Sequence, residues 1–490
     1  MKRRDFLMAA AAGSLLTACA GQTPPLASTK KQKKQNFLFI LVDDLGWRDL
    51  GCFGSPLYET PHIDRLASQG MRFTDAYAAA PVCSPTRVSI MTGKYPARLS
   101  TTHWFGAPQP EQVLQSEEWE HPMLPASYTD QLSRNEVTIA EALKGAGYRS
   151  FYAGKWDLGG KQHYPENQGF DANKGGWEKG HPSSYFSPYQ NPKLKDGEDG
   201  EHLPERLARE SVQFLEKNSK HPFLLFLSFY SVHLPLQGRE DLIKKYEAKL
   251  ADINFDEPDY SGEGAERTKR RQDNAVYAAM VEAMDEAVGR VLNTLDRLQL
   301  SDNTTICFIS DNGGVSSSQH GVTTNAPLRA GKGWLYEGGI RVPMIVKAPG
   351  ITAAGSTCSH PVLSTDFYPT MLELAGLPLD PEQHADAVSF LPLLLGESLP
   401  KDRPLFWHFP HYTAQGSFPG GAVRLGSYKL IQSFEDQHFE LYNLRDDLEE
   451  QVDLIHEAPN YAEPMKEMLK KWQKDMNARF PSPLSKAALK

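Results

Sequence analysis

The sequence predicts an α/β fold, in which helices flank a large, mostly parallel sheet and a smaller C-terminal α+β subdomain follows. Short apolar runs that end abruptly in polar residues recur along the chain, with stretches of helical periodicity between them. From about residue 401 the pattern changes to short, strand-like pieces. The 490 residues, of which 40% are hydrophobic, are enough to bury the core of such a domain.

Three apolar runs are expected to be strands of this sheet, and polar residues follow each of them. The runs are 37–42 before Asp43 and Asp44, 223–227 before His233, and 306–309 before Asp311 and Asn312. In open α/β sheets, ligands bind in the crevice beyond the carboxyl ends of the strands. The pattern therefore predicts that polar residues far apart in the sequence meet in one site.

A long helix is expected before the third of these strands. Between Asn274 and Leu300, apolar residues recur mostly at three- and four-residue steps. This spacing predicts an amphipathic helix that packs on the sheet. We assign the whole region 36–400 to one catalytic domain.

The C-terminal part is expected to form a separate α+β subdomain over residues 401–490. Within it, 428–431 and 439–442 are predicted strands, and 461–476 is a predicted helix. We expect this subdomain to close one side of the site.

The first residues have the pattern of an export signal. Basic residues at positions 2–4 precede an apolar stretch over 8–18 that is too short to span a bilayer. The run 3–7 resembles a twin-arginine signal. The run 16–19 resembles a bacterial lipobox, whose cysteine, Cys19, is acylated after cleavage.

We therefore expect an exported lipoprotein of the periplasm or the cell surface, which meets the membrane only through its lipid anchor. Residues 1–19 would be the signal segment, and residues 20–35, rich in Pro, Thr and Lys, would be a flexible tether. The alternative is plain secretion, in which Cys19 is lost with the signal.

The net charge and the cysteine spacing argue against a nucleic-acid-binding protein and against a disulfide-rich one. A net charge of −9 argues against a nucleic-acid binder, because phosphate contacts need a basic face. Any anionic substrate must therefore be held by local cations. The five cysteines are scattered without the paired spacing of a metal site, and we expect no disulfide framework.

A cysteine at a predicted helix start is the most informative single feature. Cys83 stands before Ser84 and Pro85, and proline is favoured in the first turn of a helix. Such an end presents unpaired N–H groups and partial positive charge, which favour a bound anion. Arg87 adds a full charge and a planar fork suited to an oxyanion.

Acidic residues at two strand ends predict a metal site. An isolated pair such as Asp43 and Asp44 is often only a solvated turn, but Asp311 and Asn312 repeat the design at a second strand end. Three carboxylates and an amide oxygen, with no histidine or thiolate in either motif, suit Ca²⁺ or Mg²⁺ better than zinc.

The run Cys83–Arg87, followed by Thr92-Gly93, resembles the defining motif of the type I, formylglycine-dependent sulfatases of the alkaline phosphatase superfamily. The resemblance extends from about Asn36 to Leu454, and it implies an alkaline-phosphatase-like fold. It also implies that a formylglycine-generating or sulfatase-maturating enzyme oxidises Cys83 to an aldehyde, whose hydrate is the nucleophile. A geminal diol can expel sulfate by collapsing back to the aldehyde, so its second hydroxyl supplies the exit.

The same resemblance implies roles for the charged residues. Calcium would be bound by Asp43, Asp44, Asp311 and Asn312 together with the modified Cys83. Lys155, His233 and Lys332 stand where the family has its sulfate-binding groups, and with Arg87 they would neutralise charge that builds up in the transition state. Asp311 would take the proton of the nucleophile, and His233 or Lys332 would protonate the leaving alcohol.

One residue departs from the family pattern. The family usually continues its lysine motif with a histidine that helps to deprotonate the formylglycine hydroxyl, whereas this sequence has Asp157. Asp157 could act as that base if it is paired with Lys155 or the metal. His103 or His163 could substitute for it instead.

The sequence therefore predicts a sulfatase that hydrolyses sulfate esters, with sulfated carbohydrates or polysaccharides as the preferred substrate class. Aromatic residues over 102–105 and 406–412 could line sugar subsites or simply pack in the core. One alternative is a phosphonate monoester or phosphodiester hydrolase of the same superfamily. Another is a catalytically inactive, lipid-anchored, glycan-binding relative.

Overall fold

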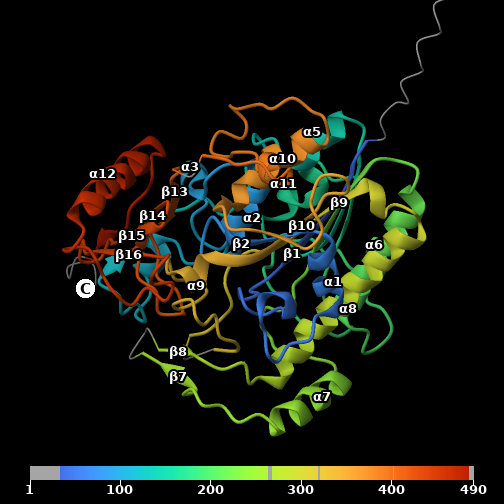
Figure 1. The fold of residues 1–490 in the computed structure, drawn as a ribbon, viewed down its shortest axis with the longest axis horizontal. Coiled ribbons are helices and arrows are strands. Elements are labelled where there is room, and N and C mark those ends of the chain that lie inside the picture. Colours follow the sequence, from blue (N-terminus) through green and yellow to red (C-terminus); the bar gives the residue numbers. More distant parts are fainter. Residues whose placement is uncertain (1–33, 263–266, 318–320, 401, 485–490) are drawn as a thin grey trace, which may run out of the picture. The chain divides into compact units, whose positions relative to one another are not determined.

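The central sheet has nine strands among the residues that the computed structural model describes, 34–262, 267–317, 321–400 and 402–484 (Figure 1). Its order is β11-β2-β10-β9-β1-β6-β4-β5, and β12 also pairs with β2. The strands are β1 (Asn36–Val42), β2 (Met71–Tyr77), β4 (Arg149–Gly154), β5 (Ala172–Lys174), β6 (Phe223–Ser228), β9 (Thr304–Ser310), β10 (Arg341–Lys347), β11 (Ser356–Cys358) and β12 (Val362–Leu363). Only β10 runs antiparallel to its neighbours, which confirms the mostly parallel sheet.

The three strands predicted from apolar runs are neighbours in this sheet. The runs 37–42, 223–227 and 306–309 fall in β1, β6 and β9. β1 pairs in parallel with β9 on one side, where Val42 lies opposite Ser310, and with β6 on the other, where Leu41 lies opposite Ser228. The three carboxyl ends therefore finish at the same edge, as expected from the sequence.

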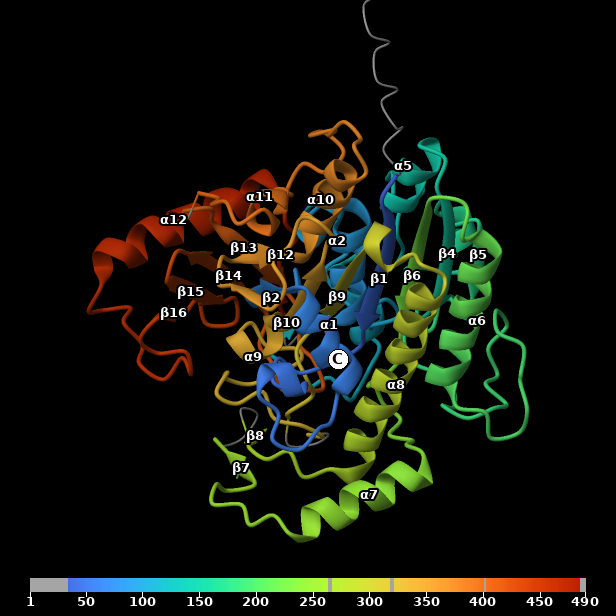
Figure 2. The same cartoon turned by 45° about the vertical axis from the view of Figure 1, so that its right-hand side comes forward.

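Helices cover both faces of the sheet because the side chains of β1 alternate between two hydrophobic cores. On one face, Leu38, Ile40 and Val42 belong to the core that contains residues of α1 (Pro61–Gln69), α6 (Leu203–Asn218) and α8 (Ala275–Arg297). On the other face, Phe37, Phe39 and Leu41 belong to the core that contains residues of α2 (Cys83–Thr92), α5 (Ile139–Gly145) and α10 (Phe367–Leu374). Figure 2 shows α6 and α8 on one side of the strands and α2 and α10 on the other.

The helix predicted between Asn274 and Leu300 is α8. The Asn274 side chain caps it by accepting a hydrogen bond of 3.0 Å from the backbone N–H of Tyr277. α7 (Glu240–Ala251) packs against α8 on the side away from the sheet (Figure 1).

The C-terminal part forms a second, antiparallel sheet, which confirms the predicted α+β subdomain. Its strands, in order, are β13 (Leu405–Phe409), β14 (Gly420–Leu425), β15 (Tyr428–Ser433) and β16 (Phe439–Asn443). α12 (Pro459–Asp475), the predicted last helix, packs on β13, β14 and β15. The boundary drawn at residue 401 stays a prediction.

The remaining α-helices and strands of the described chain are short. They are α3 (Pro96–Leu99), α4 (Pro110–Val113), α9 (Glu337–Ile340), α11 (Leu391–Leu394), β3 (Met123–Leu124), β7 (Tyr260–Ser261), β8 (Thr268–Lys269) and β17 (Ser482–Pro483). The predicted signal segment, Cys19 and the predicted tether as far as residue 33 lie outside the described residues. Within the described part of the chain, no helix is both long and apolar enough to cross a membrane.

A buried ion cluster joins the second sheet to the first. Lys429 of β15 is fully buried, and its ammonium lies 3.0 Å from a carboxylate oxygen of Glu337 and 2.9 Å from one of Glu450. Arg424 of β14 reaches Asp75 of β2 at 2.8 Å. Burial raises the pKa of Glu450 to about 7 despite the nearby ammonium of Lys429. Removing the Lys429 ammonium would therefore leave the buried carboxylates of Glu337 and Glu450 without their main partner.

The substitution Lys429→Met is expected to lower the free energy of unfolding by about 3–5 kcal/mol, because it strands buried negative charge. The matched control is Lys471→Met, which removes an ion pair to Asp475 from a lysine side chain that is 76% exposed. That change should cost less than ~0.5 kcal/mol. Urea unfolding of both variants tests this, and equal effects would show that the cluster contributes little.

Candidate active site

The ends of two strands carry an acidic cluster, which we define as Asp43, Asp44, Asp311 and Asn312. Asp43 and Asp44 follow β1 directly, and Asp311 and Asn312 follow β9. None of the four is more than 1% exposed. Carboxylate oxygens of the three aspartates and Sγ of Cys83 all lie within 4.8 Å of one another. The residues that the sequence assigns to a metal site thus meet at one point.

Cys83 enters this point as the first residue of α2. Val82 precedes the helix in an extended conformation, and Cys83 Sγ lies 3.4 Å from a carboxylate oxygen of Asp43. Burial, and then the charge of Asp43, raise the pKa of the Cys83 thiol well above its usual range. An unmodified thiol here would stay protonated and would be a poor nucleophile.

Three cations balance the three carboxylates. The Arg87 guanidinium donates to Asp311 at 2.8 Å. The Lys155 ammonium donates to Asp43 at 2.8 Å, and that of Lys332 lies 2.7 Å from Asp44. All three pairs are almost fully buried, so each charge depends on its partner.

Further hydrogen bonds hold Arg87 at the sheet edge. Its second arm donates to the backbone oxygen of Lys155 at 2.8 Å and to the Ser228 hydroxyl at 2.7 Å. Ser228 ends β6, the second predicted strand. The arginine therefore links α2 to the ends of the central strands.

Asn312 shows that the acidic cluster fits a hard cation. Its amide nitrogen donates to Asp44 at 2.8 Å, whereas its amide oxygen is buried with no hydrogen-bond partner among the described residues. A buried, unsatisfied amide oxygen beside three carboxylates is a suitable ligand for calcium or magnesium. Burial also raises the pKa of Asp43 well above its usual range even with Lys155 beside it, and a bound cation would offset that cost.

His233 follows β6, and its ring faces Asp44 of the acidic cluster. Its Nδ1 lies 2.7 Å from the backbone oxygen of Leu234, so this nitrogen carries the proton and Nε2 is left facing Asp44 at 3.7 Å. Burial and the charge of Lys332 lower the pKa of His233 to about 3, which keeps the ring neutral. The ring of His181 stacks parallel to it at 6.3 Å.

Asp157 lies near the Lys155 ammonium, in a left-handed backbone conformation with a φ of 59°. Its carboxylate accepts a hydrogen bond of 2.7 Å from the Ser84 hydroxyl and lies 3.8 Å from the Lys155 ammonium. The predicted pairing with Lys155 is therefore present in the structure. Burial raises the pKa of Asp157 above its usual value despite these partners.

The two histidines considered as substitutes for Asp157 differ in position. His103 lines the pocket and stacks on His411, with ring centroids 4.3 Å apart. His163 is not among the lining residues, and its Nδ1 lies 2.8 Å from the backbone oxygen of Leu132. Of these two, only His103 can meet a molecule in the pocket.

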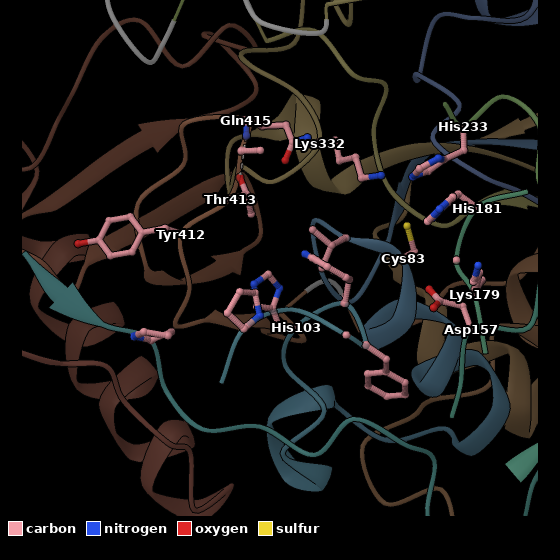
Figure 3. Close-up of a pocket in the computed structure, with 18 of the residues that line it drawn as sticks. Cys83, His103, Asp157, Lys179, His181, His233, Lys332, Tyr412, Thr413 and Gln415 are labelled. Carbon is pink, nitrogen blue, oxygen red and sulfur yellow. Dashed lines mark hydrogen bonds between the residues drawn. The ribbon is translucent and has the colours of Figure 1, made fainter. Parts of the chain in front are cut away.

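Cys83, Asp157 and His233 lie at one end of a pocket of about 760 Å³ (Figure 3). The charged lining residues are Lys155, Asp157, Glu178, Lys179 and Lys332. The uncharged ones include Cys83, His103, Trp104, Phe105, Trp119, His121, His181, His233, Tyr412 and Gln415. The two predicted aromatic stretches differ in position. Trp104, Phe105 and Tyr412 line the pocket, whereas residues 406–409 fall within β13 and do not line it.

Sequence reasoning missed several lining residues, among them Trp119, His121 and His181. They lie in irregular segments whose spacing carries no helical or strand period, so no pattern marked them. The glycine before His181 has a structural reason: a β-carbon at Gly180 would lie 2.9 Å from the Asp157 carboxylate.

Comparisons with known proteins agree with this geometry. The model of the Sulfatase family matches residues 35–377, and that of the N-sulphoglucosamine sulphohydrolase C-terminal family matches residues 330–478. A sulfatase of Formosa agariphila is 33% identical, with 89% of this chain and 88% of the relative covered. A steryl-sulfatase of Rattus norvegicus is 30% identical, with 81% and 76% covered.

A solved structure of a similar protein extends this likeness to the fold. The crystal structure of Ps i-CgsB in complex with k-i-k-neocarrahexaose superimposes with a TM-score of 0.74 at 30% identity. The likeness covers 90% of this chain and 93% of that protein.

Calcium is expected to raise the midpoint of thermal unfolding by a few degrees relative to a chelator, because an ion that binds only the folded protein stabilises it by about 2.7 kcal/mol at 100 times its dissociation constant. Asn312→Ala should abolish most of this shift, since it removes the unsatisfied oxygen. Asn293→Ala, on an exposed position of α8, is the matched control and should keep the shift. A wild-type protein that does not respond to calcium or magnesium would contradict the assignment.

Proposed function

The chain belongs to the sulfatase family, a family of sulfuric ester hydrolases, and from that premise we propose that it desulfates carbohydrates with a formylglycine at position 83 and a bound calcium ion. One observation carries the proposal. Cys83 Sγ, three carboxylates and three cations gather at one end of a pocket large enough for a sugar sulfate. Calcium at the acidic cluster would polarise the reacting groups, and the formylglycine hydrate would supply the attacking hydroxyl together with the second hydroxyl that lets sulfate leave.

The cations of the chain bind and neutralise the sulfate. Lys155 and Lys332 line the pocket beside Cys83, and Arg87 lies beneath it, within 2.8 Å of Asp311. Because these charges are buried and already oriented, they can stabilise charge on the sulfate oxygens without rearranging. The Asp311 carboxylate, within 4.8 Å of Sγ, is the proposed acceptor of the nucleophile's proton.

The leaving alcohol needs a proton, and two groups are positioned to supply it. His233 faces the pocket with Nε2, and the Lys332 ammonium lies on the same side (Figure 3). Lys332 is the better proton donor, because its ammonium carries a proton. Burial and the positive charge of Lys332 keep the His233 ring neutral, so its Nε2 has no proton to give. His233 would then hydrogen-bond to the substrate and orient it.

A carbohydrate is the proposed substrate class. A protein of 30% identity, Ps i-CgsB, has been crystallised in complex with k-i-k-neocarrahexaose. The pocket combines charged groups at one end with aromatic rings elsewhere, a composition that suits a sulfated sugar. A substrate screen tests this proposal. It compares sulfated saccharides with steroid sulfates, aryl sulfates and a phosphodiester, since the family includes a steryl-sulfatase and the superfamily includes phosphodiesterases. A marked preference for a steroid sulfate or a phosphodiester would overturn the carbohydrate proposal.

We also propose that the protein is exported and held at the membrane by a lipid on Cys19. The basic start, the short apolar stretch and the lipobox-like run at 16–19 support this. The remaining partner is the enzyme that converts Cys83. A twin-arginine route would allow both conversion and folding in the cytoplasm before transport.

Conversion of Cys83 is tested by expressing the protein with and without a formylglycine-generating enzyme. The peptide that contains position 83 should have the mass of the aldehyde when the protein is active. Cys83→Ala should lower kcat/KM for sulfate release by ~10³-fold or more, because it removes the nucleophile. Cys52→Ala, at a half-buried cysteine outside the pocket lining, should leave activity unchanged. Full activity of a protein that keeps an unmodified thiol would refute the mechanism.

Asp157 is proposed to act as the base for which the family usually uses histidine. Asp157→Asn keeps the size and the hydrogen bond from Ser84 but removes the base, so kcat should fall by about 10²–10³-fold. Asp157→His should restore much of the activity. Ser84→Ala, which removes only the hydrogen bond, should cost less than ~10-fold. If the asparagine variant retains wild-type kcat, Asp157 has no such role, and His103 becomes the next candidate.

A further inference from the structure

The pocket extends well beyond the groups that bind sulfate. Figure 3 shows Cys83, His181 and His233 at one side of it and Tyr412 at the opposite side, with His103 between them. A volume of about 760 Å³ is in the upper part of the ~300–1,000 Å³ range of pockets that enclose drug-sized ligands. A single sulfated sugar ring would therefore leave the side near Tyr412 unfilled.

Three side chains, which we call the aromatic wall, line this extension: Trp119, His121 and Tyr412. His121 and Tyr412 stack face to face, with centroids 3.9 Å apart and planes at 9°. Trp119 meets both rings edge-on, at 4.9 Å from His121 and 5.9 Å from Tyr412. Trp104 is 42% exposed and lies beside His103, at 5.8 Å.

Hydrogen bonds fix the wall in place. The Trp119 indole N–H donates to the backbone oxygen of Met123 at 3.1 Å, and the Tyr412 hydroxyl donates to Glu435 at 2.7 Å. Tyr412 follows β13 of the second sheet, whereas Trp119 precedes β3. Two distant parts of the chain thus build one rigid apolar surface, the kind of surface on which the C–H face of a sugar ring packs.

The charges in the pocket are distributed unevenly. Its lining lysines are Lys155, Lys179 and Lys332. The first and last are paired with Asp43 and Asp44, and Figure 3 shows Lys179 on the same side of the pocket as Cys83. Two charged neighbours of the aromatic wall are acidic: Glu435 accepts the hydrogen bond from Tyr412, and Glu120 stands between Trp119 and His121 in the sequence.

His121 of the wall and His103 in the middle of the pocket do not change this balance. Burial lowers the pKa of His121, and it lowers that of His103 to about 3, so both rings are neutral near pH 7. A second sulfate or a carboxylate at the wall would lose water without gaining a cation, which disfavours its binding. An uncharged sugar ring has no charge to desolvate, so its binding carries no such cost.

Building on the carbohydrate sulfatase proposed above, we propose that the aromatic wall binds an uncharged sugar next to the sulfated one. The substrate is then a sulfated oligosaccharide or polysaccharide whose sulfated residue has a neutral neighbour, rather than one in which sulfated sugars alternate with uronates. Specificity arises from two separate parts of the pocket: the cations select the sulfate, and the aromatic wall selects the neighbour.

The first test uses the wild-type, formylglycine-containing enzyme with three substrates: a galactose sulfate, a galactan disaccharide with the same sulfate and a neutral neighbour, and a matched disaccharide with a uronate neighbour. The neutral disaccharide should have a kcat/KM about tenfold or more above that of the monosaccharide. The uronate disaccharide should gain much less. Equal values for all three, or a preference for the uronate, would overturn the proposal.

The second test uses a variant of the wall. Trp119→Ala should raise KM for the neutral disaccharide by about tenfold and leave kcat/KM for the monosaccharide within about twofold of wild type. Tyr461→Ala, at an aromatic residue that is 44% exposed on α12 and outside the pocket lining, is the matched control and should change neither value. Equal losses on both substrates would show that the wall does not act as a separate subsite.

The two proposals fail differently. If the wild-type enzyme releases no sulfate from any saccharide, the proposed function itself is wrong. If it releases sulfate equally well from single sugars and oligosaccharides, and the Trp119→Ala variant matches the wild type, only the inference about the wall is wrong.

Discussion

Three carboxylates buried at the ends of two neighbouring strands are the constraint on which the rest of the site depends. Asp43, Asp44 and Asp311 would repel one another in a medium from which water is excluded, unless cations lie beside them. Arg87, Lys155 and Lys332 supply those cations, each from a different segment of the chain. In the proposed mechanism, the same positive groups that make the cluster tolerable are those that meet a sulfate at Cys83. Folding stability and chemistry are therefore linked through one set of charges.

The second sheet contributes to this site from a distance. Its connection to the first sheet includes the buried ion cluster around Lys429. This anchorage holds β13, and the segment after β13 brings Tyr412 to the pocket on the side away from Cys83. The pocket thus has a charged end built by the first sheet and an aromatic end completed by the second. A substrate that spans both ends needs the two sheets to be held rigidly together.

The sequence predicts the charged end better than the aromatic end, for a physical reason. Residues such as Asp43 and Asp311 follow apolar strands, and the parallel pairing of β1 and β9 brings such strand ends together. The antiparallel course of β10 carries no comparable signal, because a buried strand has the same apolar pattern in either direction. Trp119 and His181 lie in irregular segments, whose paths depend on tertiary contacts rather than on local periodicity.

The most direct measurement of the central claim is a crystal structure of the Cys83→Ser variant, grown with calcium and a sulfated galactan disaccharide. The account predicts a cation bound by the three aspartates and the Asn312 amide oxygen, with the sulfate group between that cation and the Lys155 and Lys332 ammonium groups. A cluster that keeps only its internal ion pairs, with the sulfate bound elsewhere on the protein, would contradict it.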